Sequence, residues 1–108
     1  MLFWATYCRP CTEELPQIQE LYKQHKADGF EIIGVNVDSP GAPIQQYITQ
    51  YKVAWPQIHE PGGLQGTIAQ QYGVITLPTM FLVDKTGKVV TASATVDDLK
   101  KQVPELVK

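Results

Sequence analysis

The sequence WATYCRPC, residues Trp4–Cys11, contains both cysteines of this 108-residue chain, with two residues between them. A short apolar run, Leu2–Trp4, leads into it, and we expect that run to form a buried β-strand. An amphipathic α-helix is predicted to follow, because one helical face recurs at steps of four and three: Cys11, Leu15, Ile18, Tyr22 and His25. This order of strand, turn and helix places both sulfur atoms at a helix N-terminus. Unpaired N–H groups and the helix macrodipole favour an anion there, so the position suits a thiolate.

The spacing of the two cysteines also suits a reversible disulfide. Residues three apart on a helix have Cβ atoms about 5–6 Å apart, and a disulfide needs roughly 3.5–4.5 Å, so a modest adjustment closes the bond. We expect Cys8 at the exposed tip and Cys11 one turn further in, which makes Cys8 the attacking thiolate and Cys11 the resolving thiol. The charge of Arg9 is expected to lower the pKa of the Cys8 thiol, and Pro10 to stiffen the turn.

Three other uses of the cysteines are less consistent with the sequence than redox chemistry. A zinc site needs two more ligands, and the two histidines, His25 and His59, fit no zinc-finger spacing. A structural disulfide across so short a loop stabilises little. Two unrelated buried cysteines leave the Arg-Pro pair between them unexplained. Redox chemistry is therefore favoured, and the alternative is a non-catalytic metal-binding or redox-sensing module that uses Cys8, Cys11 and His59.

Composition narrows the remaining classes of protein. A length of 108 residues and a hydrophobic fraction of 44% predict a single globular domain over residues 1–108. A net charge of −2 argues against nucleic-acid binding. No apolar run approaches the roughly 18 residues of a membrane span. Since the first strand begins almost at Met1 and no signal peptide is visible, we expect a domain truncated at its N-terminus.

Helical spacing and capping residues predict four helices. The first extends from near Cys8 to about Ala27, contains Pro16, which is expected to kink it, and is ended by Asp28-Gly29. The second is expected to start with Ser39 as N-cap and Pro40 at the first position, followed by Ile44, Tyr47, Ile48 and Tyr51. The third covers Leu64–Tyr72 and is closed by Gly73. The fourth starts at a capping box of Thr95 and Asp98 and ends near Val107, with Pro104 inside it.

Strands are predicted between these helices. The nearly continuous apolar segment Phe30–Asp38 is typical of a strand buried on both faces. A weaker strand is expected at Trp55–His59, followed by a loop over Glu60–Gly63. Two further strands, Met80–Asp84 and Lys88–Ala92, form a hairpin through Lys85–Gly87. Alternating strands and helices followed by a hairpin and a helix predict an α/β fold with a mixed central sheet flanked by helices.

Several motifs, in the same order along nearly the whole chain, resemble the thioredoxin superfamily and, more narrowly, its TlpA/ResA-type thiol–disulfide oxidoreductases. They are Trp4–Cys11, Glu14-Leu15-Pro16, Gly34–Asp38, and Leu77–Asp84 with Gly87-Lys88. The resemblance implies a thioredoxin-like fold that lacks its N-terminal strand or hairpin. It also implies Cys8 as nucleophile, Cys11 as resolving thiol, and a cis peptide bond before Pro78 in a loop against the cysteines.

The same resemblance suggests roles for other residues. The backbone of Leu77 is expected to pair with an extended substrate segment, so that Thr76 and Leu77 influence partner choice. With Pro78, the residues Trp4, Tyr7, Arg9 and Pro10 are expected to complete the substrate-binding surface, although Trp4 also fits a core position. Glu14 lies one turn beyond Cys11 and is expected to relay the proton of the resolving thiol; the alternative is a solvated helix glutamate.

The resemblance finally implies what the protein acts on. Proline before the second cysteine is typical of members that reduce disulfides, so we expect a reductant of apocytochromes or other exported proteins. Its partners are then protein disulfides and an upstream thiol protein that donates electrons. No metal and no cofactor beyond the Cys8–Cys11 pair is expected. A monomer in an extracytoplasmic location is expected, and a peroxidase is disfavoured because no peroxidatic cysteine pattern is recognised.

Overall fold

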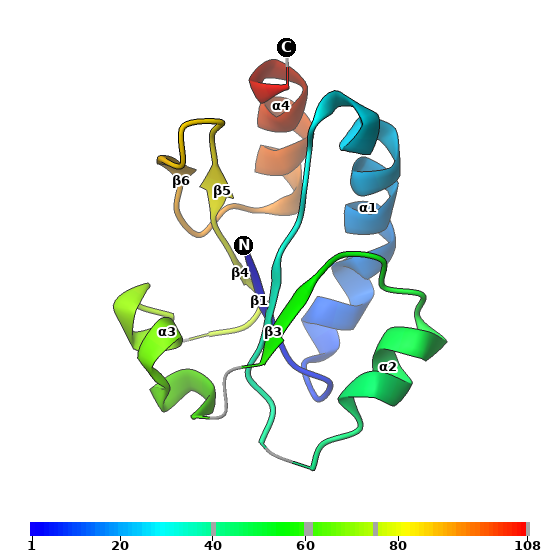
Figure 1. Ribbon diagram of the computed structural model, residues 1–108, viewed down its shortest axis with the longest axis vertical. Coiled ribbons are helices and arrows are strands. Elements are labelled where there is room, and N and C mark those ends of the chain that lie inside the picture. The colour runs from blue at the N-terminus through cyan, green and yellow to red at the C-terminus, as the bar shows by residue number, and fades with distance from the viewer. Residues whose placement is uncertain (40, 60–61, 75, 108) are drawn as a thin grey trace.

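The computed structural model describes residues 1–39, 41–59, 62–74 and 76–107. At its centre is a sheet in the order β3-β2-β1-β4 (Figure 1). Its strands are β1 (Leu2–Trp4), β2 (Gly34–Asn36), β3 (Gln57–His59) and β4 (Thr79–Met80). The first three strands are parallel and β4 is antiparallel to β1, which confirms the predicted mixed sheet.

The strand expected over Phe30–Asp38 is shorter in the structure. Only Gly34–Asn36 forms the ladder, and all of its residues are buried, as predicted for an inner strand. The reason lies in the register: β1 begins at Leu2, whose partner is Gly34, and Leu2 N–H donates to the carbonyl of Ile33 at 2.9 Å. Residues 30–33 therefore precede the part of β2 that β1 can pair with.

Helices lie on both sides of the sheet (Figure 1). The long helices α1 (Arg9–His25) and α4 (Val96–Leu106) pack against each other, and α3 (Thr67–Gln71) lies across the strands from them. The helix α2 (Ile44–Gln50) follows β2. Helix α1 continues through Pro16 into a 3₁₀ turn, Lys26–Asp28, and Gly29 ends it with a φ of 100°, as predicted.

Two helix starts differ in how well the sequence predicted them. The capping box of α4 is confirmed: Asp98 N–H donates to the Thr95 hydroxyl at 3.1 Å, and Thr95 N–H donates to the Asp98 carboxylate at 2.9 Å. The prediction of Ser39 as N-cap of α2 is wrong, because that helix begins at Ile44 with Pro43 as its N-cap. Ser39 instead closes a turn by accepting Ala42 N–H at 3.2 Å. Pro40, expected at the first helical position, lies outside the described residues.

Two other predicted elements are divided in the structure. The helix expected over Leu64–Tyr72 is a 3₁₀ turn, Gly63–Gln65, followed by α3, and Gly73 closes it with a φ of 67°. The strand expected over Met80–Asp84 is split into β4 and β5 (Leu82–Val83). Since Met80 pairs with Leu2 at the start of β1, the chain beyond it pairs with β6 (Val89–Thr91) in a separate hairpin. In the predicted loop before α3, Glu60 and Pro61 lie outside the described residues.

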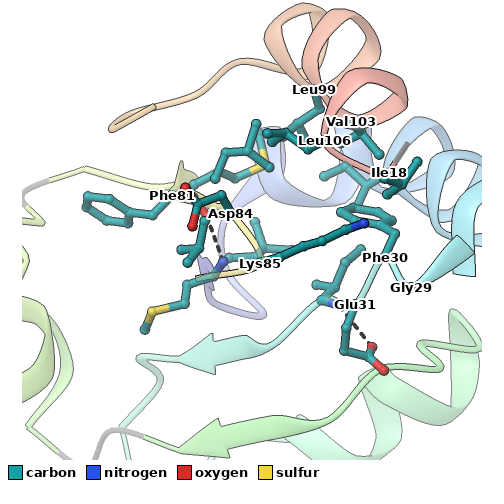
Figure 2. Close-up of a pocket in the computed structure, with 17 residues that line it drawn as sticks. Ile18, Gly29, Phe30, Glu31, Phe81, Asp84, Lys85, Leu99, Val103 and Leu106 are labelled. Atoms are coloured by element: carbon teal, nitrogen blue, oxygen red, sulfur yellow. Dashed lines mark hydrogen bonds between the residues drawn. The ribbon is translucent and has the colours of Figure 1, made fainter. Parts of the chain in front are cut away.

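The core is centred on β1. Phe3 is fully buried, with its ring 6.0 Å from that of Tyr72 and 5.9 Å from that of Phe81. Away from the cysteines lies an apolar cavity of about 260 Å³, lined by Phe30, Phe81 and α4 side chains that include Leu99 and Val103 (Figure 2). The cysteine turn leaves the opposite end of β1, so this cavity and the cysteines lie at different ends of the sheet.

Candidate active site

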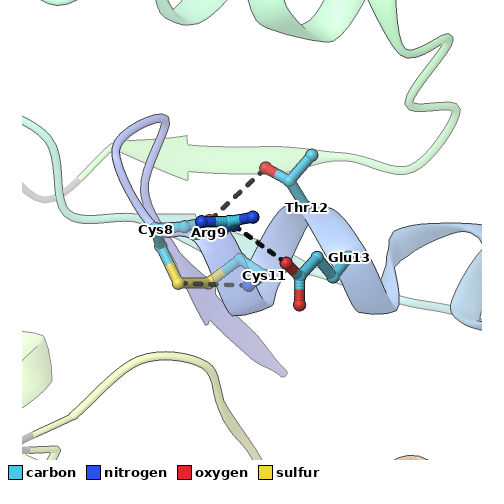
Figure 3. A network of polar contacts seen from close by, with 5 residues as sticks. All are labelled: Cys8, Arg9, Cys11, Thr12 and Glu13. Carbon is cyan, nitrogen blue, oxygen red and sulfur yellow. Dashed lines mark hydrogen bonds and ion pairs between the residues drawn. A yellow bond between two sulfur atoms is a disulfide. The ribbon is translucent and has the colours of Figure 1, made fainter.

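Cys8 and Cys11 are joined by a disulfide at the start of α1 (Figure 3). Their Cα atoms are 5.3 Å apart. Cys8 is the N-cap residue in an extended conformation, and its sulfur accepts the backbone N–H of Cys11 at 3.2 Å. The sulfur of Cys8 thus occupies the place of an N-cap oxygen, where the unpaired N–H groups and dipole of the helix stabilise negative charge.

The expectation that Cys8 lies at an exposed tip is wrong for this oxidised state. Cys8 and Cys11 are each 6% exposed. The bond to Cys11 and the hydrogen bond from its N–H draw the sulfur of Cys8 over the first turn of the helix. Exposure is found instead on the flanking residues: Tyr7 is 68% exposed, and Arg9 and Pro10 are also exposed.

The turn before Cys8 is fastened to the end of β2 by a buried carboxylate. Asp38, 2% exposed, accepts the backbone N–H of Thr6 at 2.9 Å and its hydroxyl at 2.8 Å. The amide of Asn36 donates to the same carboxylate at 2.7 Å, and its oxygen accepts Asp38 N–H at 2.9 Å. Sequence reasoning missed Thr6, Asn36 and Asp38 as site residues. The available signal was that alternate polar residues close an apolar strand, since neighbouring parallel strands end at the same sheet edge.

A second set of contacts supports the first turn of α1 from its other side. The Thr12 hydroxyl lies 3.3 Å from the carbonyl of Cys8 and 2.8 Å from the Tyr47 hydroxyl. The Tyr47 ring stacks on Trp4 with ring centroids 4.8 Å apart. Trp4 is only 4% exposed and donates its indole N–H to Gln57 at 2.8 Å. Trp4 therefore belongs to the core, and its placement in the substrate-binding surface is wrong because its side chain is covered.

Arg9 is paired with another side chain rather than directed at Cys8 alone. Its Nε lies 3.0 Å from the carboxylate of Glu13, and the two side chains are 89% and 64% exposed (Figure 3). A neighbouring negative charge and surrounding water both weaken the field of the guanidinium at the sulfur. The helix start is therefore the stronger stabiliser of a Cys8 thiolate.

Glu14 lies one helical turn beyond Cys11 and is half-buried. Burial raises the pKa of its carboxyl group above the ordinary value. One of its oxygens, Oε2, is buried without a hydrogen-bond partner among the described residues. These properties distinguish Glu14 from a solvated helix glutamate, and its role in proton transfer stays a prediction.

The peptide bond between Leu77 and Pro78 is cis, as the family resemblance implied. Thr79 pairs with Phe3 in the antiparallel ladder of β1 and β4. Residues 76–78 therefore lie alongside the end of β1 from which the cysteine turn leaves. Thr76 is exposed, and Leu77 and Pro78 are half-buried. This register brings the predicted peptide-binding segment and the cysteines to the same end of the sheet.

The histidines and acidic residues that the structure describes do not gather into a metal site. Among the described residues, no group of three or more His, Cys, Asp or Glu side chains could hold a metal ion. His59 Nε2 lies 2.9 Å from the carbonyl oxygen of Asp38, and His25 Nδ1 lies 3.6 Å from Asp28. Within the described part of the chain, no helix has the length and apolarity needed to cross a bilayer.

Solved structures and curated relatives resemble this chain closely. A thiol-disulfide oxidoreductase from Bacteroides fragilis superimposes with a TM-score of 0.87 at 29% identity, covering 97% of this chain and 77% of that one. The thioredoxin domain of an oxidoreductase of the same kind from Bacteroides vulgatus gives 0.87 at 29% identity, covering 99% and 76%. Thiol-disulfide oxidoreductase ResA of Bacillus thuringiensis subsp. konkukian is 39% identical over 106 residues, which are 98% of this chain and 59% of that protein.

A mixed sheet between helices, with a cysteine pair at the start of the first helix, defines a thioredoxin-like protein. The profile of the AhpC/TSA family matches residues 1–92, and the chain belongs to this family. It spans about three fifths of the length of the ResA relatives, 59% of the protein from B. thuringiensis and 60% of that from Geobacillus thermodenitrificans.

Proposed function

We propose that this chain is a thiol–disulfide oxidoreductase that reduces disulfides in partner proteins through Cys8 and Cys11. The observation that carries the proposal is the disulfide at the N-terminus of α1, beside a segment containing a cis proline. Curated relatives named thiol-disulfide oxidoreductase support it. A pair that closes within one helical turn can pass two electrons without moving the fold.

The reaction follows thiol–disulfide exchange. In the reduced protein, the Cys8 thiolate attacks one sulfur of the partner disulfide, which forms a mixed disulfide and releases the partner's other sulfur as a thiolate. Cys11, as a thiolate, then attacks the sulfur of Cys8 and releases the partner's second thiolate. The partner gains two electrons, and the Cys8–Cys11 disulfide forms. A second thiol protein restores the dithiol by the same two steps in reverse.

The surroundings of each sulfur suit its role. Cys8 occupies the N-cap position, where the N–H of Cys11 and the helix dipole stabilise its thiolate. Cys11 must lose its proton before it attacks. The half-buried Glu14, whose pKa is raised by burial, is the proposed acceptor and relays that proton to solvent.

The partner is proposed to bind as an extended segment across residues 76–78. An extended peptide can hydrogen-bond to the backbone of Leu77, as in strand addition to a sheet. The exposed side chains of Tyr7, Arg9, Pro10 and Thr76 then contact the residues that flank its cysteine. The apolar face of Tyr7 and the charge of Arg9 together favour a mixed apolar and acidic surface on the partner.

The biological setting is part of the proposal and comes from the family resemblance of the motifs. We propose a reductant of exported proteins, including apocytochromes, that works outside the cytoplasm with a thiol protein as electron donor. The chemistry above requires no redox group other than the two cysteines. Each of its steps uses one copy of the chain, which supports a monomer.

The mechanism is tested by trapping the mixed disulfide. Cys11→Ser should accumulate a stable adduct with a disulfide-containing protein on Cys8, because the resolving attack is removed. Cys8→Ser is the matched control and should form no adduct in the same incubation. An absence of adduct on Cys11→Ser would contradict the mechanism. Stoichiometric metal in the reduced wild-type protein without insulin reduction would instead support the metal-binding or redox-sensing alternative.

A further inference from the structure

The side chain of Gln57 spans β2 to reach β1. Gln57 lies on the edge strand β3, directly opposite Gly34 of β2. Its Oε1 accepts the indole N–H of Trp4 on β1 at 2.8 Å. A Cβ atom at Gly34 would collide with the amide of Gln57. The glycine therefore leaves the space through which a polar side chain reaches from the edge of the sheet to the strand that leads to the cysteines.

The contact with Trp4 determines the orientation of the Gln57 amide group. An indole N–H can only donate, so the amide oxygen must be the atom that faces Trp4. The amide nitrogen, Nε2, is consequently turned away from Trp4. It is buried and has no hydrogen-bond partner among the described residues. Buried N–H donors in folded proteins almost always have a hydrogen-bond partner, so we expect one here that is not a side chain of the described residues.

A small cavity lies where such a partner would be needed. It has a volume of about 10 Å³ and is lined by Gln57, Trp55 and Cys11 together with apolar and aromatic side chains. A cavity of this volume is just large enough to hold one water molecule. The indole Nε1 of Trp55 is also buried without a partner among the described residues, so two residues with unused donors line a cavity that also borders the resolving cysteine.

The chemistry of the donors decides what a water in this cavity can do. A water that accepts from both Gln57 Nε2 and Trp55 Nε1 has both lone pairs occupied. It then has only its own hydrogens to offer. Besides Cys11, the cavity is lined by Tyr47, whose hydroxyl is already hydrogen-bonded to that of Thr12, so the sulfur of Cys11 is the acceptor we consider. Such a water can donate to a thiolate but cannot take a proton from a thiol. Its role is thus distinct from that of Glu14.

We propose that Gln57 and Trp55 hold one water that donates a hydrogen bond to the sulfur of Cys11 in the reduced protein, which makes both of them positioning residues for the resolving thiol. This inference rests on the proposed dithiol–disulfide cycle. When Cys11 gives up its proton to attack the mixed disulfide, the oriented water stabilises the resulting anion inside the fold, where bulk solvent does not reach it.

The test is a titration of Cys11 as the sole thiol, in the full chain carrying Cys8→Ser. The NMR chemical shift of isotope-labelled Cys11 Cβ reports its ionisation. Adding Gln57→Met keeps the length of the side chain and removes the amide donor. We expect the pKa of Cys11 to rise by about one unit, which is about tenfold less thiolate at a given pH. Trp55→Phe should raise it in the same direction, and Gln57→Glu should raise it more than Gln57→Met, because it adds a negative charge.

Gln102→Met is the matched control, since Gln102 is also half-buried and its Oε1 accepts from the Thr91 hydroxyl at 2.7 Å, far from the cysteines along the chain. It should leave the pKa of Cys11 unchanged. An unchanged pKa in both Gln57→Met and Trp55→Phe would overturn the proposal, and so would an equal rise in Gln102→Met. If Gln57→Met does not fold, Trp55→Phe alone decides. The titration needs no turnover, so its failure is separate from failure of the trapping experiment.

Discussion

Asp38 is the residue that holds the cysteine turn to the sheet. Its carboxylate accepts two hydrogen bonds from Thr6 and one from Asn36 in a buried setting. Hydrogen bonds to a charged group are stronger than neutral ones, and their loss leaves buried donors unpaired. Because Thr6 is two residues before Cys8, the same contacts that stabilise the fold also fix the path of the chain into the disulfide.

Asp38→Ala is therefore expected to lower the free energy of unfolding by about 2–3 kcal/mol. Chemical denaturation of the oxidised protein measures this loss. Asp97→Ala, at an exposed position on α4, serves as a control, and we expect it to change the free energy by less than about 1 kcal/mol. Equal losses in the two variants would show that the buried network contributes nothing specific.

Glu14 makes the free energy of unfolding depend on pH, because the pKa of its carboxyl group differs between the folded and unfolded states. Burial raises the pKa of its carboxyl group above the ordinary value of 4.5, so the folded state binds the proton more tightly than the unfolded state. The stability from this group is fully present below 4.5 and is lost as the pH rises through the raised pKa. Glutamine does not titrate. The free energy of unfolding of the wild type minus that of Glu14→Gln should therefore fall across this window, measured by denaturation at a series of pH values. A difference that stays constant with pH would contradict the burial of this carboxyl group.

Among the helices and strands, the sequence correctly predicted the features that depend on neighbouring residues. The capping box of α4, the Gly29 stop and the strand–turn–helix around the cysteines are set by residues within a few positions of one another. Strand lengths are different, because they depend on where a partner strand begins. Phe30 and Ile32 have the apolar character of a strand, but β1 offers a partner only from Gly34 onward. The N-cap of α2 is an exception among the local features, because Ser39 uses its carbonyl in a turn that precedes the helix.

The Gln57 side chain of β3 lies over Gly34 of the neighbouring strand β2, and this contact can be tested by substitution. Gly34→Ala places a Cβ against the Gln57 amide, so we expect it to lower the free energy of unfolding by about 1–3 kcal/mol. In a Gln57→Ala background the obstacle is gone, and the same substitution should cost clearly less. Thermal or chemical unfolding of the four proteins in this cycle measures the coupling. Additive effects would mean that the two side-chain positions do not compete for space.

For the whole molecule, the order of strands and helices predicted the mixed sheet. The family resemblance implied the cis peptide bond before Pro78 and a loop there that lies against the cysteines. What the motifs did not predict was the burial of particular side chains around the cysteines. Trp4 was placed partly at the substrate surface and Cys8 at an exposed tip, yet both are covered. Side-chain exposure depends on contacts from distant segments, such as Tyr47 on Trp4, and these have no signal in the local sequence. The network around Asp38 had a signal, the polar residues that end an apolar strand, but the sequence did not mark which distant segment they contact.

Phe3 is the centre of the core and sets the scale of the whole protein's stability. Its ring is fully buried between Tyr72 and Phe81, on segments far apart in the chain. Phe3→Ala is expected to cost about 3–5 kcal/mol, which is a large part of a typical total of about 5–15 kcal/mol. Phe3→Leu keeps most of the volume and should cost less than about 1.5 kcal/mol. Denaturant midpoints compare the two variants, and a loss in Phe3→Ala as small as that in Phe3→Leu would contradict the central place of this ring in the core.

The nearly complete solvation of Arg9 has a practical consequence. Its side chain is 89% exposed and forms an ion pair with Glu13, one turn along the same helix. Replacing it should leave folding untouched while altering the electrical character of the surface that meets a visiting molecule. Position 9 can thus be varied separately from the core, and we expect its exchange to change the reduction potential of the cysteine pair only slightly, because water and Glu13 already weaken the charge of Arg9.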